Sequence, residues 1–145
     1  MNPEDFFTPE QEQRIVNAIR QAEKNTSGEI RVHLESKNKD KPTLNYVWKV
    51  FEAIGMQETK QANGVLFYID IKHRTFSIVA DEGINKVVPK NFWEAITKIV
   101  TGGFKQGKYA DALEQGILKV GEQLKQYFPH KADDVNELPD EISKH

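Results

Sequence analysis

NGVLFYIDIKHRTFSIVADEGI, at residues 63–84, decides the fold because it predicts two adjacent strands. VLFYI at 65–69 is a continuous apolar and aromatic run, typical of a strand that is covered on both faces. KHR at 72–74 supplies a polar reversal, and the return strand is expected over residues 75–80, where apolar residues alternate. Because the connection is short, we expect the two strands to be antiparallel.

Two helices and one strand are expected before this hairpin. TPEQ at 8–11 matches a capping box with proline at the first helical position, so a helix of about four turns should follow. The alternating residues 29–35 predict a strand with one wetter face, at an edge of the sheet. Residues 43–56 show helical spacing, and a helical crossover makes the strands on either side of it parallel.

Two more helices are expected after the hairpin. One follows Pro89, and the pair Gly102-Gly103 should end or bend it; the other carries an apolar stripe that ends near Phe128. These elements predict one α/β domain over residues 1–128, with a single mixed sheet and helices on its faces, followed by an acidic tail over 129–145 that docks loosely or is mobile. The expected core includes Leu66, Phe67, Ile69, Ile78, Leu113, Ile117, Val120 and Leu124.

Composition excludes several classes of function. The 145 residues include no cysteine, which rules out thiol nucleophiles and cysteine-based metal sites. A net charge of −2 with scattered lysines and arginines argues against nucleic-acid binding. The sequence shows neither a signal peptide nor an apolar run of ~20 residues, so we expect a cytoplasmic protein without a membrane partner. The phosphate loop, the dinucleotide fingerprint and the hydrolase elbow are absent as well.

The expected topology brings several acidic and amide side chains to one edge of the sheet. The starts of the first two strands and the end of the third should meet there, which makes Glu29, Asn63 and the pair Asp81-Glu82 neighbours. Carboxylate, amide and carbonyl oxygens are the ligands that Ca²⁺ and Mg²⁺ prefer. The sequence therefore predicts a divalent-cation site at this edge, with these four residues as its ligands.

A structural explanation of the same residues stays open. Asp81 and Glu82 could cap a turn, Asn63 could fill one, and Glu29 could pair with a nearby cation. Among the other polar groups, Asp70 beside His73 is interpreted as closing a β-turn. Glu35 is interpreted as part of a solvated, lysine-rich loop.

The chain also resembles a known family, the TPM domain, in a short and free-standing bacterial form. The motifs that carry the resemblance are SGEIRV at 27–32, NGVL at 63–66, DEGI at 81–84, FWE at 92–94 and NELP at 136–139. The resemblance implies a three-layer α/β/α sandwich of Rossmann-like shape. It also implies that some members bind Ca²⁺ or other divalent ions at an acidic pocket, and that plant members are acid phosphatases.

Two hypotheses of function follow. The first is a Ca²⁺-binding module, with Mg²⁺ as the other candidate ion, that presents a surface to a protein partner. The second is a metal-assisted phosphomonoesterase, in which the ion neutralises phosphate charge and activates water. An enzyme would need an open metal position and a basic clamp for phosphate, for which Arg31 and Lys86 are the candidates. No catalytic residue is assigned, and the binding module is preferred.

Overall fold

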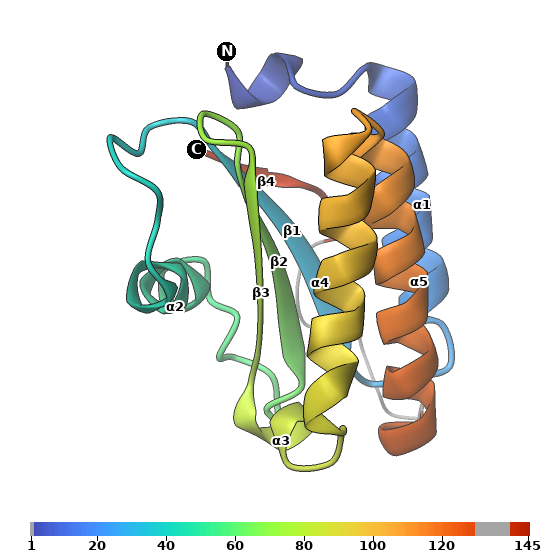
Figure 1. The fold of residues 1–145 in the computed structure, drawn as a ribbon. Helices are drawn as coiled ribbons and strands as arrows, with labels where there is room; N and C mark the ends of the chain where they lie inside the picture. Colours follow the sequence, from blue (N-terminus) through green and yellow to red (C-terminus); the bar gives the residue numbers. More distant parts are fainter. Residues whose placement is uncertain (1, 130–139) are drawn as a thin grey trace.

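The computed structural model describes residues 2–129 and 140–145, which form a sheet flanked by helices (Figure 1). In chain order the elements are η1 (Pro3–Asp5), α1 (Pro9–Glu23), β1 (Glu29–Glu35), α2 (Leu44–Ala53), β2 (Gly64–Asp70), β3 (Thr75–Ala80), α3 (Glu82–Asn85), α4 (Lys90–Lys105), α5 (Tyr109–Tyr127) and β4 (Ser143–Lys144). The predicted capping box is present at the start of α1, where Thr8 and Gln11 exchange side-chain and backbone hydrogen bonds.

The sheet has the strand order β3-β2-β1-β4 and mixes two pairing directions. β1 and β2 are parallel, with Glu29 opposite Gly64, while β2 and β3 are antiparallel, with Val65 opposite Ala80. The predicted pairing of the three longer strands is therefore confirmed. The prediction that β1 is an edge strand is wrong, because β4 pairs with β1 in parallel, with Ser143 opposite His33. The end of the acidic tail thus belongs to the sheet.

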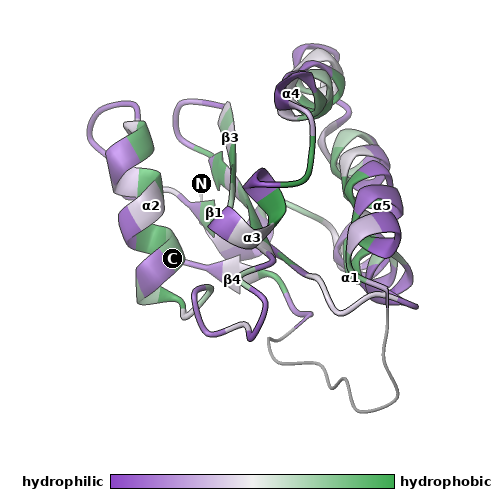
Figure 2. Ribbon diagram, turned by 90° about the horizontal axis from the view of Figure 1, so that it is seen from below, coloured by the Kyte–Doolittle hydropathy of each residue, from purple (hydrophilic) through white to green (hydrophobic). Residues whose placement is uncertain are grey.

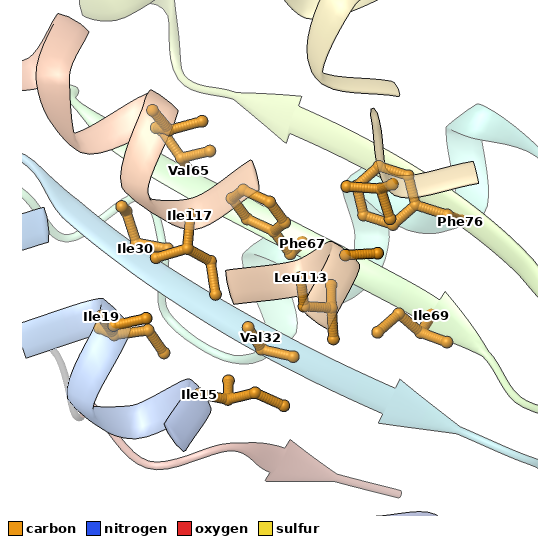
Figure 3. Close-up of a cluster of buried hydrophobic side chains, with 14 of the residues drawn as sticks. Ile15, Ile19, Ile30, Val32, Val65, Phe67, Ile69, Phe76, Leu113 and Ile117 are labelled. Atoms are coloured by element: carbon orange, nitrogen blue, oxygen red, sulfur yellow. The ribbon is translucent and has the colours of Figure 1, made fainter. Parts of the chain in front are cut away.

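Helices cover both faces of the sheet, which gives the three-layer α/β/α sandwich (Figures 1 and 2). α1, α4 and α5 lie on one face and α2 lies on the other. The larger apolar cluster fills the three-helix side, where Ile117 and Leu113 of α5 meet Phe67 of β2 (Figure 3). A smaller cluster under α2 contains Phe51 and Leu66.

The predicted core residues are buried, except that Ile78 is only partly buried and packs against the larger cluster. The glycine pair does not end α4, which continues through it to Lys105. Gly103 lies against α5, where an added Cβ would come within 2.4 Å of the Ala112 Cβ. The glycine at 103 is thus explained by close helix packing and does not mark a helix end.

Two helical glycines in different surroundings test the packing. A Cβ at Gly121 of α5 would lie 2.6 Å from the Ala22 Cβ and 2.7 Å from the Ala22 Cα on α1, whereas a Cβ at Gly102 would meet nothing within 4 Å. We expect Gly121→Ala to lower the free energy of unfolding by about 1–3 kcal/mol through overpacking. Gly102→Ala should raise it by up to about 1 kcal/mol because alanine is the better helix former. Urea denaturation of both variants measures the difference, and equal effects would contradict the α1–α5 contact.

Candidate functional site

Three of the four predicted cation ligands lie at one edge of the sheet. The Glu29 N–H donates to the Asn63 carbonyl at 3.3 Å, and the Asp81 N–H donates to the Gly64 carbonyl at 3.0 Å. These bonds place the starts of β1 and β2 and the end of β3 side by side. We refer to Glu29, Asn63 and Asp81 as the amino-end edge, because β1 and β2 both begin there.

Asp81 and Glu82 stand at the start of the short helix α3. The Asp81 carboxylate accepts a hydrogen bond from the Glu82 N–H at 2.8 Å, so it caps the helix. Glu82 is exposed, and its carboxylate lies 3.3 Å from the Lys86 ammonium. The capping role that the structural explanation allowed is therefore present, and it uses one oxygen of the Asp81 carboxylate.

Asn63 has an incompletely satisfied side chain. It is 1% exposed, and its Nδ2 donates to the Ser27 hydroxyl at 3.3 Å. Its Oδ1 is buried and accepts no hydrogen bond from residues 2–129 or 140–145. Buried amide oxygens are normally paired, so this acceptor is a candidate ligand atom.

The backbone around this edge is tightly packed. A Cβ at Gly83 would lie 2.1 Å from the Gln61 carbonyl oxygen and 2.6 Å from that of Ala62. Only glycine therefore fits at position 83, because a side chain would collide with backbone atoms. The two carbonyls direct oxygen atoms toward the start of α3.

A second group of acids lies beside the start of β1. Glu23, at the end of α1, accepts the Ile30 N–H at 2.8 Å and shares a hydrogen bond with Asp140. Burial, the hydrogen bond with Asp140 and the nearby charges of Asp140 and Glu29 raise the pKa of Glu23 to about 10. Glu23 is therefore protonated at neutral pH, and its proton relieves the repulsion within the group. Sequence analysis missed Glu23 and Asp140, since they are 117 positions apart and meet only in the folded chain.

The described parts of the chain, 2–129 and 140–145, contain no group of three or more His, Cys, Asp or Glu side chains placed to hold a metal ion. A cation at the amino-end edge would therefore need amide or carbonyl oxygens and water beside its carboxylates. Such mixed oxygen sets suit Ca²⁺, which takes six to eight oxygen ligands in flexible geometry. Asn63 and Asp81 fit that chemistry.

The opposite end of the sheet holds a buried polar network that the sequence did not predict. Glu35, interpreted from the sequence as solvated, is 6% exposed. Its Oε2 accepts hydrogen bonds from the hydroxyls of Tyr68 at 2.6 Å and Tyr46 at 2.9 Å. Asn38 donates to the same oxygen at 3.3 Å and to the Tyr68 hydroxyl at 2.7 Å. The solvated-loop interpretation of Glu35 is thus wrong, because three other side chains replace water around its Oε2.

His33 extends this network to β4. The imidazole is fully buried, with its Nε2 3.1 Å from Glu35 Oε1 and its Nδ1 2.9 Å from the Ser143 hydroxyl. Because an ionised carboxylate only accepts, Nε2 carries the hydrogen and donates to Glu35. Burial alone would raise the pKa of Glu35, but the hydrogen bonds from His33, Tyr68 and Tyr46 outweigh it and lower the pKa to about 2. Burial and the Glu35 carboxylate raise the pKa of Tyr46 to about 12.

Asp70 and His73 form a separate pair at the hairpin. The fully buried Asp70 carboxylate accepts the backbone N–H groups of Lys72 and His73, and its second oxygen contacts the His73 Nδ1. This arrangement closes the turn between β2 and β3, as the sequence indicated.

The fold and the polar edges define the class of protein, an α/β/α sandwich domain with an open mixed sheet. The TPM domain family matches residues 1–123, and the chain belongs to this family. Of the motifs that indicated it, NELP at 136–139 lies outside the described residues. A comparison with curated proteins gave no significant match. In the described residues, no helix is long and apolar enough to cross a membrane.

Solved structures of bacterial proteins share the fold. The NMR structure of the BA42 protein from the psychrophilic bacterium Bizionia argentinensis is 47% identical, covers 99% of this chain and 98% of its own, and superposes with a TM-score of 0.90. An N-terminal domain from P. gingivalis is 21% identical over 89% of this chain and 85% of its own, with a TM-score of 0.69. The N-terminal domain of the cg2496 protein from Corynebacterium glutamicum is 12% identical over 91% and 82%, with a TM-score of 0.66. The last two similarities concern the fold alone.

The proton on Glu23 makes stability depend on pH. Because the pKa of this carboxyl group is raised on folding, from 4.5 to about 10, its stabilising contribution is complete below pH 4.5 and declines as the pH rises toward 10. Glu23→Gln keeps a donor for Asp140 and an acceptor for Ile30, but it has no proton to lose. We expect this variant to be more stable than the wild type at pH 8 by at least about 1 kcal/mol, with a smaller difference at pH 5.

Chemical denaturation at several pH values measures this effect. Glu122→Gln, which changes an exposed carboxylate on α5, serves as the control and should follow the wild type at each pH. A Glu23→Gln variant that loses stability between pH 5 and pH 8 as steeply as the wild type would refute the assignment of the proton.

Proposed function

We propose that this TPM domain is a divalent-cation-binding module that takes Ca²⁺, or Mg²⁺ in its place, at the amino-end edge and presents a surface to a protein partner. The observation that carries the proposal is the Asn63 Oδ1, which is buried and accepts no hydrogen bond from the described residues. It lies where the starts of β1 and β2 and the end of β3 meet. A cation would satisfy this oxygen, as ligation by protein oxygens does in calcium sites generally.

Of the four ligands that the sequence indicated, Asn63 and Asp81 are the direct ligands in this proposal, because the described residues hold no three acids placed to bind one ion. Asp81 contributes the carboxylate oxygen that does not cap α3, and Asn63 contributes its amide oxygen. Glu29 adds negative charge from the start of β1. Glu82 adds further negative charge at this edge while it remains paired with Lys86.

A binding role is favoured over hydrolysis by the contacts of Arg31 and Lys86, the two residues that could clamp a phosphate. The Arg31 guanidinium donates to the Ile54 carbonyl at 3.2 Å, and Lys86 pairs with Glu82. Lys86 therefore has a partner, and Arg31 has one at its Nη1, while the Arg31 Nε is buried and has no hydrogen-bond partner among the described residues. The exposed apolar side chain of Val87, just beyond α3, is the feature of this edge that suits a protein partner.

The test is a calorimetric titration of demetallated protein with Ca²⁺ and with Mg²⁺. Asp81→Asn should weaken binding by about tenfold or more, since it removes a charged ligand, while asparagine caps a helix as well as aspartate does. Asp40→Asn, in an exposed loop, is the matched control and should bind like the wild type. At a hundredfold excess over the dissociation constant, Ca²⁺ should stabilise the fold by about 2.7 kcal/mol.

Two results would count against this proposal. Equal cation affinities for Asp81→Asn and Asp40→Asn would remove the amino-end edge as the site. Hydrolysis of a generic phosphomonoester clearly above background, and lost in Asp81→Asn, would make the metal-assisted phosphomonoesterase the better account.

A further inference from the structure

The face of β1 that lies toward α2 is polar. By strand alternation, Arg31, His33 and Glu35 share this face, while Ile30, Val32 and Leu34 belong to the larger core on the opposite face. The apolar side chains of α2 instead pack over β2 and β3, where Val79 and Leu66 lie. The strip of β1 beside α2 is thus lined by polar side chains, of which His33 and Glu35 are 0% and 6% exposed.

A pocket of about 330 Å³ occupies this strip. Its lining consists of His33, Glu35, Lys37, Tyr46, Lys49, Val50, Ala53, Ile54 and His145. The residues from α2 are spaced three, four and seven positions apart, so they project from one side of the helix. The pocket lies at the carboxyl ends of β1 and β4, which is where open α/β sheets commonly bind ligands.

The floor of the pocket is a hydrogen-bonded network in which the acid already has partners. Both oxygens of Glu35 accept hydrogen bonds, from His33 on one side and from Tyr46 and Tyr68 on the other. The donors around Glu35 compensate its charge, which reduces its repulsion of an incoming anion. The ring of Tyr46 and the imidazole of His33 are held in place by the same bonds.

The rim is basic and one wall is apolar. Lys37 and Lys49 are exposed, and neither forms an ion pair with any residue in the described part of the chain. Val50, Ala53 and Ile54 supply the apolar wall. A ligand that matches both features carries a negative group for the lysines and a small apolar body for the wall.

We propose that this pocket binds a small organic anion, with its phosphate or carboxylate group between Lys37 and Lys49 and its apolar body against Val50, Ala53 and Ile54. This site is independent of the proposed cation site, because it lies at the opposite end of β1. Glu35 is a positioning residue in it, since it acts through Tyr46 and His33.

The experiment is an NMR titration of ¹⁵N-labelled protein with phenyl phosphate, benzoate and inorganic phosphate, each used alone. Lys37→Gln and Lys49→Gln should each weaken binding of the preferred aromatic anion by about three- to fivefold. Lys39→Gln and Lys41→Gln change lysines of the same loop that do not line the pocket, and they should leave the affinity unchanged. Ala53→Phe, at an exposed position, should block the aromatic anions while the fold persists.

The relative affinities of phenyl phosphate and benzoate identify the negative group, and tighter binding of either one than of inorganic phosphate supports the proposal. Three outcomes would overturn it. These are no shift of pocket amides at millimolar concentrations, equal losses in the control lysine variants, and aromatic anions that bind no better than inorganic phosphate. Because circular dichroism can confirm the fold of each variant, a loss of binding can be separated from a loss of structure.

Discussion

The Glu35 carboxylate is the interaction on which the α2 side of the sheet depends. It receives donors from His33 on its own strand, from Asn38 in the following loop, from Tyr46 on α2 and from Tyr68 on β2. Through His33 it also reaches Ser143, so that β4 is held to the edge of the sheet. A buried charge is costly unless several hydrogen bonds compensate it. Since four segments of the chain supply those bonds, and β4 joins them through His33, the charge also specifies how these segments fit together.

This network divides the sheet into two ends with different chemistry. At the carboxyl ends of β1 and β4, the acid is satisfied and the exposed charges that line the pocket are those of Lys37 and Lys49, which suits an anion. At the amino ends of β1 and β2, acids dominate and a buried amide oxygen accepts no hydrogen bond from the described residues, which suits a cation. The parallel pairing of β1 with β2 maintains this separation, since it places Glu29 beside Gly64 at one end and Glu35 beside Asp70 at the other.

The features of the fold that depend on local sequence pattern could be predicted from the sequence. The hairpin, the parallel crossover and the apolar stripe of α5 follow from periodicity, and the grouping of Glu29, Asn63 and Asp81 follows from topology. The features that the sequence did not predict depend on contacts between residues far apart in the chain. The charged residues of β1 resemble a wetter face, yet His33 and Glu35 are buried because Tyr68 and Ser143 provide the hydrogen bonds that water would otherwise supply. β4 was missed because a strand of two residues carries no periodic signal. The protonated Glu23 was missed because two acidic side chains seldom share a proton, and Asp140 is far away in the sequence.

The central claim is that Glu35 is an ionised, fully hydrogen-bonded carboxylate in the folded protein. The direct measurement is a ¹³C NMR titration of the Glu35 side-chain carboxyl as the pH is lowered. The account predicts no change of its shift above about pH 3, because the hydrogen bonds lower its pKa to about 2. A midpoint at or above the ordinary value of 4.5 would contradict the network and the arrangement of α2 and β4 that depends on it.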